Sequence, residues 1–396
     1  MANRDVVITG IGLVSSLGEG GGTHWQKLSA PGTAPVVDAD RFQPYSIHPL
    51  PEIDWGQQIA KRGDQRQMET WQRLGTYTAG MALDDAGIKG NDELCATMDM
   101  VVAAGGGERD ESVDAGLLAA SETRNDRGIL LNEKLTTELR PTLFLAQLSN
   151  LLAGNISIVH KVTGSSRTFM GEEGAGVAAI ETAAARIRSG QSTHVLVGGA
   201  FQTEHSDMLL GYELAGYLHR GPWKPVWQRQ GSEGGGIVTG SGGAFLVLES
   251  REHAESRGHK IYAQLGPVAS GRAKRRSDGG LASGISGLLG KLELPEGDLL
   301  TISGASGAHA ATAAEKAVLE ANPALAERAF SSLTGHMKEA QFPFAVALAA
   351  LAINNSAGYP AFAAGEKEFA GTPKNVLATA VGYHQFEGVA LVSAPR

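Results

Sequence analysis

Residues 164–190 combine a strand, a sharp turn and a helix in one short stretch, and this order restricts the fold more than any other part of the sequence. The pattern predicts a strand, a glycine turn over residues 171–176 and then a helix closed by a left-handed cap at Gly190. The apolar residues on one face of that helix are Val177, Ile180, Ala184 and Ile187. A buried strand is expected to follow at residues 194–199. Folds mount nucleophiles at such turns because the helix dipole favours an anion there, and the residue projected here is Glu173.

Composition narrows the class of protein. A chain of 396 residues exceeds what one hydrophobic core usually serves, so two closely packed units are expected. The net charge of −8 argues against a nucleic-acid partner. Cys95 is the single cysteine, which excludes an internal disulfide framework, and its position before a strand suits a small apolar filler. No secretory signal or span of about 20 apolar residues is present, so a cytoplasmic location is expected.

Several familiar catalytic motifs do not fit. The third glycine of a dinucleotide-binding turn that begins at Gly10 falls on Ser15. The glycine-rich run over residues 231–243 lacks the Gly-Lys-Ser/Thr of a phosphate-binding loop. Neither the Gly-x-Ser-x-Gly elbow of hydrolases nor a His-Glu-x-x-His metal motif occurs in the sequence, and no metal is expected. Strands and helices alternate in two similar halves, which predicts a layered α/β architecture.

Four segments together resemble the β-ketoacyl-acyl-carrier-protein synthases, the condensing enzymes of the thiolase superfamily. Residues 6–18, VVITGIGLVSSLG, are similar to the opening strand and turn of that family. Residues 224–244 resemble its Arg-Pro-Phe-Asp segment and the glycine turn that follows. Residues 164–199 resemble its active-site segment, in which Glu173 stands on the nucleophilic cysteine, seventeen residues before Gly190. Leu333-Thr334-Gly335-His336 matches its Thr-Gly-His.

The resemblance implies a five-layered αβαβα thiolase-like fold built from two halves. Residues 1–250 would form the first half, with helical insertions over residues 110–153, and residues 251–396 the second. Such chains dimerise through the strand before the nucleophile, which here is residues 167–170. A degenerate member that lacks the cysteine is similar to the chain-length factors that pair with active ketosynthases.

The family's catalytic residues are only partly present. His336 stands at the second catalytic histidine, and Ser331 replaces the lysine found five residues earlier. The first histidine maps onto Gly304 or Ala305, and a shifted alignment would bring His309 to that role instead.

The acyl pocket is also altered. The family's Gly-x-x-Gly turn after Thr-Gly-His has become residues 339–342, with Phe342 at its end, which suggests a filled or reshaped tunnel. In the C-terminal signature that gates the pocket, Gly382 and the aromatic Tyr383 remain.

Three interpretations of Glu173 follow, because a carboxylate cannot hold a thioester. The chain could be a non-condensing partner of a cysteine-bearing ketosynthase, a malonyl-carrier-protein decarboxylase, or a protein with another ligand in which Glu173 is a core substitution. An active 3-oxoacyl-acyl-carrier-protein synthase is the enzyme alternative. The resemblance further implies an acyl carrier protein as partner, substrates carried on its phosphopantetheine and no other cofactor, and a homodimer or heterodimer. The basic cluster at Arg272, Lys274, Arg275 and Arg276 is either a solvated loop or a docking point for that acidic carrier.

Overall fold

A computed structural model describes residues 4–275 and 279–395, and within them the strands join into one 11-stranded sheet. The path runs β4-β3-β5-β6-β1-β7-β11-β10-β8-β9, and the short β2 pairs with β1 outside this path. The strands in chain order are β1 (Val6–Ser15), β2 (Gly18–Glu19), β3 (Asp99–Ala103), β4 (Ser166–Phe169), β5 (His194–Phe201), β6 (Gly242–Ser250), β7 (Ala263–Gly271), β8 (Leu299–Ser303), β9 (Leu325–Ala329), β10 (Asn375–Val381) and β11 (Glu387–Ser393).

The two ends of this path repeat each other. In the first half β3 pairs in parallel with β4 and β5, and β6 joins antiparallel to β5 and then to β1. In the second half β8 pairs in parallel with β9 and β10, and β11 joins antiparallel to β10 and then to β7. The halves meet where residues 6–8 of β1 pair with residues 263–265 of β7. The chain therefore contains the same five-stranded unit twice.

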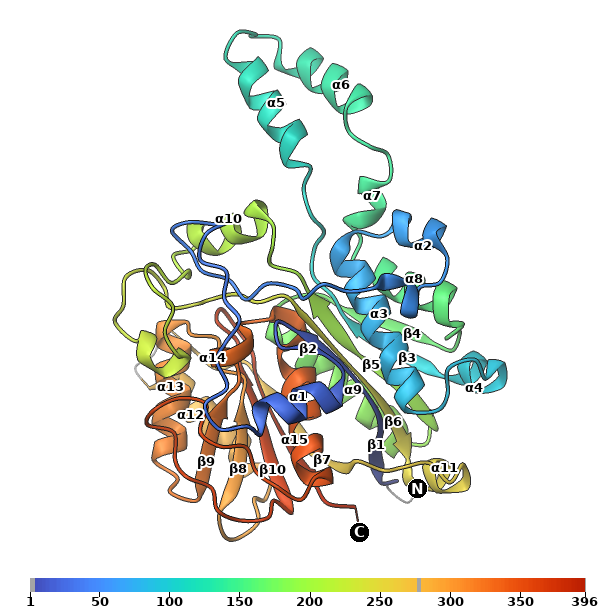
Figure 1. The fold of residues 1–396 in the computed structure, drawn as a ribbon, viewed down its shortest axis with the longest axis vertical. Coiled ribbons are helices and arrows are strands. Elements are labelled where there is room, and N and C mark those ends of the chain that lie inside the picture. The colour runs from blue at the N-terminus through green and yellow to red at the C-terminus, as the bar shows by residue number, and fades with distance from the viewer. Residues whose placement is uncertain (1–3, 276–278, 396) are drawn as a thin grey trace.

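Two central helices lie between the halves. α9 (Glu173–Arg188) and α15 (Gln341–Asn354) contact each other, and each contacts strands of both halves. Residues 341–353 of α15 are all buried, as expected for a helix that is apolar on nearly every face. The four apolar positions predicted for one face of α9 are buried as well. Figure 1 shows these helices at the centre of the molecule.

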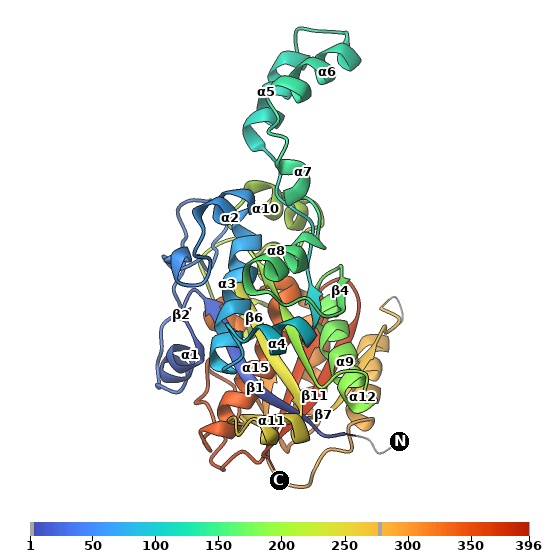
Figure 2. The same cartoon turned by 90° about the vertical axis from the view of Figure 1, so that its right-hand side faces the viewer.

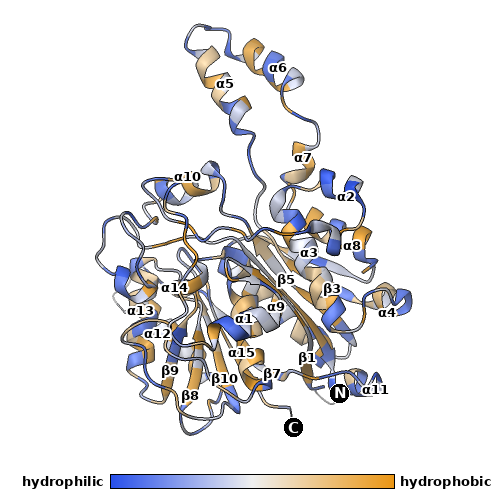
Figure 3. Ribbon diagram, viewed as in Figure 1, coloured by the Kyte–Doolittle hydropathy of each residue, from blue (hydrophilic) through white to orange (hydrophobic). Residues whose placement is uncertain are grey.

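Outer helices complete five layers, which is the predicted thiolase-like arrangement. α3 (Thr70–Asp85) and α8 (Leu151–His160) pack on the first half, while α12 (Gly280–Gly290) and α13 (His309–Glu320) pack on the second. Apart from the insertion between β3 and β4, the remaining helical segments are α1 (Gly21–Leu28), η1 (Trp55–Gln57), α2 (Arg62–Gln67), α4 (Asp92–Thr97), α10 (Ser206–Leu214), η2 (Val226–Arg229), α11 (Arg251–Ser256), α14 (Ser331–Thr334) and η3 (Lys338–Ala340). In Figure 3 the central strands carry hydrophobic colour, whereas α2 and α11 at the periphery are mostly hydrophilic.

The insertion between β3 and β4 is helical, as predicted. It contains α5 (Glu111–Ser121), α6 (Arg127–Thr137) and α7 (Leu143–Ala146) before α8. Figures 1 and 2 both show α5 and α6 projecting away from the layered body as a hairpin. Within the described ranges, no helix is long and apolar enough to cross a membrane.

The predicted glycine turn is shorter than expected. α9 begins at Glu173, so Gly174 and Gly176 lie inside the helix and only Gly171, with φ 137°, takes a conformation that favours glycine. The helical glycines are explained by close packing. A Cβ on Gly176 would lie 2.5 Å from the carbonyl oxygen of Glu339.

Candidate functional site

Glu173 occupies the first position of α9 and is completely buried. The backbone N–H of Tyr383 donates a hydrogen bond of 3.2 Å to Glu173 Oε1. The same oxygen lies 3.3 Å from Nε2 of His336. Glu173, His336 and Tyr383, which belong to three separate segments of the sequence, therefore meet at the helix tip.

Backbone pairing holds His336 in place. Its N–H donates to the carbonyl of Val238 at 2.9 Å, and its carbonyl accepts from the N–H of Gly240 at 2.9 Å. The preceding Gly335 has a φ of 74°, which turns the chain from α14 into this bridge. The imidazole ring contacts the rings of Tyr212, at 6.2 Å between centroids, and Tyr383, at 5.8 Å.

Burial keeps both members of the Glu173–His336 pair neutral near pH 7. Burial raises the pKa of Glu173 to about 8, and the neighbouring carboxylate of Glu172 adds to the rise. Burial lowers the pKa of His336 to about 3, and the positive charge of Lys338 lowers it further. The contact between them therefore joins a carboxylic acid and a neutral imidazole rather than two ions.

A second buried carboxyl lies beside this pair. Glu339 is 1% exposed, and burial raises its pKa to about 7. The ammonium group of Lys338 lies over the rings of Phe201 and Tyr212. Sequence reasoning named Glu339 only as part of a changed turn and missed Tyr212 altogether, because α10 carries no motif that marks it.

Several buried polar atoms here lack a hydrogen-bond partner among the described residues. They are Glu173 Oε2, Glu339 Oε1, the Tyr212 hydroxyl and both ring nitrogens of His336. Buried polar groups in proteins are normally satisfied by protein, water or ligand. The site therefore retains hydrogen-bonding capacity for a water molecule or a small polar group.

Gln341 connects the positions that correspond to the family's lysine and first histidine. Its Nε2 donates to Ser331 Oγ at 2.7 Å and to the carbonyl of Gly304 at 3.2 Å. Its Oε1 accepts from the N–H of Met337 at 2.8 Å. The positions predicted for the lysine and for the first histidine are thus joined by one amide, and neither provides a cationic or imidazole group.

His309 does not join the Glu173–His336 pair. It is the first residue of α13 and lines a cavity of about 870 Å³ together with Tyr217, Arg275 and Tyr383. Across the parts of the chain that the structure describes, no hydrogen bond or ring contact connects His309 with Glu173 or His336. Tyr383 is common to both places, since it lines this cavity with His309 and its backbone N–H also contacts Glu173.

The other predicted pocket residues have different surroundings. Phe342 is fully buried in the core of α15 and belongs to the cluster that packs between the two halves. The carbonyl of Gly382 accepts a hydrogen bond of 2.7 Å from Arg275 Nη1, and Arg275 also pairs with Glu387 at 2.5 Å. Arg275 therefore braces the turn before β11 rather than standing free in solvent. Arg276 of the same basic cluster lies outside the described residues.

A smaller cavity of about 300 Å³ borders the site at Glu339. Its lining includes Glu339, Lys338, Phe201, Asp207 and Arg109. Glu339 therefore faces this cavity while Tyr383 faces the larger one.

Comparison with known proteins agrees with this architecture. The family model "Beta-ketoacyl synthase, N-terminal domain" matches residues 3–254. The chain is 27% identical to 3-oxoacyl-[acyl-carrier-protein] synthase 2 of Vibrio cholerae over 275 residues, 67% of this chain and 62% of the relative. It is 28% identical to the protein of the same name from Rhizobium meliloti over 280 residues, 66% of this chain and 63% of the relative. The matched region thus spans less than two thirds of these relatives.

Solved structures extend the likeness of the fold to the whole chain. The ishigamide ketosynthase/chain length factor superposes with a TM-score of 0.80 at 22% identity, covering 100% of both chains. The type II polyketide synthase complex AntDE:AntF, whose ketosynthase is described as bound to the hexaketide, gives a TM-score of 0.73 at 19% identity, again covering 100% of both chains. The repeated five-stranded units, the helix tip at residue 173 and the match over residues 3–254 lead to one conclusion: the chain belongs to the β-ketoacyl synthase family.

Proposed function

We propose that this chain is a non-condensing subunit of acyl-chain elongation that pairs with a cysteine-bearing ketosynthase, in the manner of a chain-length factor. The observation that carries the proposal is the buried carboxyl of Glu173 at the tip of α9, held against His336 and the Tyr383 amide. Condensation requires a nucleophile that holds the acyl group as a thioester. A buried carboxylic acid cannot form one.

The surroundings of Glu173 support the same proposal. The only thiol in the sequence, Cys95, is buried in α4 on the outer face of the first half, where burial raises its pKa. Gln341 ties Ser331 to Gly304, so the groups that would polarise a malonyl carbonyl are replaced by a closed amide network.

The proposed partners are a ketosynthase and an acyl carrier protein. β4 lies at the edge of the sheet, where unpaired backbone groups favour addition of a strand from another chain, and Met170 just after it is 72% exposed. The cavity of about 870 Å³ beside Tyr383 offers room for a phosphopantetheine arm. Because that arm carries the substrate, the proposal includes no separate cofactor. AntDE:AntF is described as an acyl-carrier protein in complex with its ketosynthase, which is the kind of assembly proposed here.

Malonyl decarboxylation without condensation is the second candidate. The ring of His336 has no hydrogen-bond partner among the described residues and is free to donate to a thioester carbonyl that enters the site. Decarboxylation at His336 would require Tyr383 to move, because Tyr383 lies between the larger cavity and Glu173.

Co-expression with a cysteine-bearing ketosynthase from the same genome tests the leading proposal. A tagged chain should purify with the ketosynthase at equal stoichiometry, and Met170→Glu should weaken the complex. Leu214→Glu is the matched control, because Leu214 is equally apolar and 79% exposed but lies on α10 away from β4. The proposal would be contradicted if the chain did not purify with the ketosynthase and formed an equally stable homodimer in its absence.

A further inference from the structure

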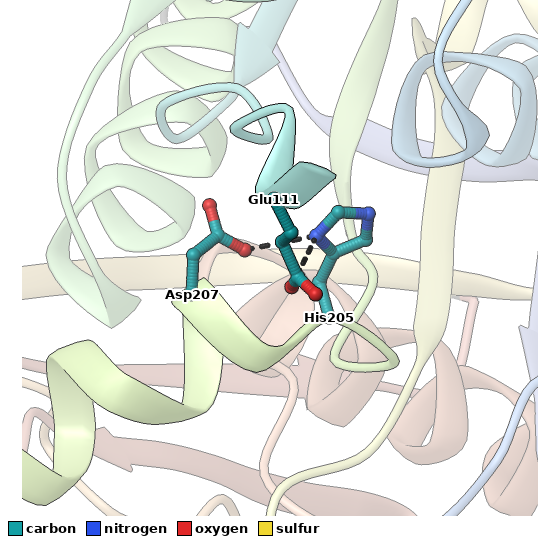
Figure 4. A group of neighbouring side chains, drawn as sticks. All are labelled: Glu111, His205 and Asp207. Atoms are coloured by element: carbon teal, nitrogen blue, oxygen red, sulfur yellow. Dashed lines mark hydrogen bonds and ion pairs between the residues drawn. The ribbon is translucent and has the colours of Figure 1, made fainter. Parts of the chain in front are cut away.

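A compact group of His and carboxylate side chains lies at the base of the projecting hairpin, outside the site described above. Glu111 begins α5, His205 directly precedes α10 and Asp207 lies in the first turn of α10. One ligand atom from each of the three lies within 4.8 Å of the others. Figure 4 shows Glu111 and Asp207 approaching the same ring nitrogen of His205 from different directions.

Two distances from His205 are compatible with the coordination of a divalent cation. His205 Nδ1 lies 3.3 Å from Glu111 Oε1 and 3.0 Å from Asp207 Oδ1. Ligand atoms that each lie about 2.0 to 2.1 Å from a tetrahedral zinc ion are about 3.3 Å apart. One imidazole nitrogen with two carboxylate oxygens favours zinc and related transition metals over magnesium or calcium.

A second carboxylate supports the imidazole from its other side. Glu108 Oε2 lies 3.3 Å from His205 Nε2, and the Glu108 side chain is buried, with 5% of the residue exposed. Its other oxygen, Oε1, has no hydrogen-bond partner among the described residues. An imidazole that binds a metal through one nitrogen usually donates its other N–H to a carboxylate, which fixes the ring and its tautomer. Glu108 stands where such a carboxylate would hold the ring if Nδ1 of His205 bound a metal.

Backbone groups orient the other two carboxylates. The N–H of Ser206 donates to Glu111 Oε1 at 2.8 Å, and the N–H of Arg109 donates to Asp207 Oδ2 at 2.9 Å. The N–H of Met208 donates to the other oxygen of Asp207, Oδ1, at 2.9 Å. Each carboxylate oxygen has two lone pairs, so one backbone hydrogen bond to each leaves capacity for a cation. The Glu111 side chain is 47% exposed, which leaves a path for an ion from solvent.

We propose that Glu111, His205 and Asp207 bind a zinc-class divalent cation, with Glu108 as the carboxylate that positions His205. A bound ion would join the start of α5 to α10 and fix the stem of the hairpin. Because Asp207 and Arg109 also line the smaller cavity, the ion would fix one wall of that cavity.

Calorimetric titration of the full, chelator-treated chain with zinc chloride tests the site. We expect one ion per chain and a rise in the melting temperature, with no comparable effect of magnesium or calcium. Glu111→Gln, at a half-exposed position that should not disturb folding, is expected to weaken zinc binding at least about tenfold, and Glu108→Gln by about 10-fold to 100-fold. The matched controls are Glu122→Gln, at the C-cap of α5, and the surface substitution His384→Gln, which should leave binding unchanged.

Hydrogen exchange provides a second readout, which locates the effect of zinc within the chain. Zinc should slow amide exchange in residues 108–121 and 205–214, and it should not do so in Glu111→Gln. The proposal would be overturned if the unmodified chain bound no zinc in the titration. So would zinc affinity that is the same in Glu111→Gln, Glu108→Gln and the controls, because the cluster would then be an ion-pair network alone.

Discussion

Glu173 Oε1 lies 3.3 Å from His336 Nε2, and both side chains are fully buried at the junction of the two halves of the fold. Each residue is neutral near pH 7, because burial disfavours the charged form of both. The place at which a condensing enzyme needs an anionic nucleophile is thus occupied by a protonated acid.

This pair makes stability depend on pH in a defined window. The pKa of Glu173 is raised from 4.5 to about 8, so the folded chain binds this proton more tightly than the unfolded chain and loses stability as pH rises through that range. His336, with its pKa lowered to about 3, acts oppositely but only below about pH 6.5. Between pH 6.5 and 8, the free energy of unfolding should fall by about 2 kcal/mol more in the unmodified chain than in Glu173→Gln. Urea unfolding at both pH values measures this difference in the free energy of unfolding. If that free energy changed equally with pH in the two proteins, Glu173 would be ionised in the folded state.

Restoring a thiol should not restore reactivity. In Glu173→Cys, made together with Cys95→Ala, the new thiol would lie at a position with no exposed surface, beneath Tyr383. We expect alkylation by iodoacetamide at least about tenfold slower than in the urea-unfolded protein, although a helix N-terminus favours the thiolate. Adding Tyr383→Ala should speed the alkylation, because it removes the side chain next to the new thiol. Rapid labelling with Tyr383 intact would show that the site is open.

Close packing of α9 against η3 should make Gly176 sensitive to substitution. A Cβ there would lie 2.5 Å from the Glu339 carbonyl oxygen and 2.8 Å from Pro343 Cδ, so Gly176→Ala should cost about 1 to 3 kcal/mol of unfolding free energy. Gly154→Ala in α8 is the matched control. Its Cβ would lie 3.6 Å from Leu151 Cδ2, and it should stabilise by up to about 1 kcal/mol. If thermal unfolding showed equal changes in stability for Gly176→Ala and Gly154→Ala, the close packing around Gly176 would be contradicted.

The unpartnered hydroxyl of Tyr212 gives another comparison. Because that hydroxyl is buried without a partner among the described residues, Tyr212→Phe should change stability by less than about 0.5 kcal/mol or increase it. Tyr359→Phe removes a buried hydroxyl that donates to the Leu348 carbonyl at 2.8 Å and should cost about 1 kcal/mol. A large loss in Tyr212→Phe would reveal a water or ligand bound at the site.

The elbow at residue 173 could be predicted because its strand, turn and helix are consecutive in the sequence. His336 and Tyr383 could be assigned from short motifs for the same reason. Glu339, Tyr212 and Gln341 could not, because their roles depend on contacts between elements far apart in the chain. The start of α9 was predicted too late, since Gly174 and Gly176 look like turn residues until their packing partners, Phe386 and Glu339, are known.

Incubation of the purified chain with malonyl-carrier protein and acyl-carrier protein, followed by mass spectrometry of the carrier, tests the central claim most directly. With the chain alone we expect neither 3-oxoacyl product nor an acyl adduct on the protein. With the ketosynthase partner we expect 3-oxoacyl product whose chain length changes with substitutions that line the cavity of about 870 Å³, such as Tyr217→Ala. Formation of 3-oxoacyl product by the chain alone would contradict the account.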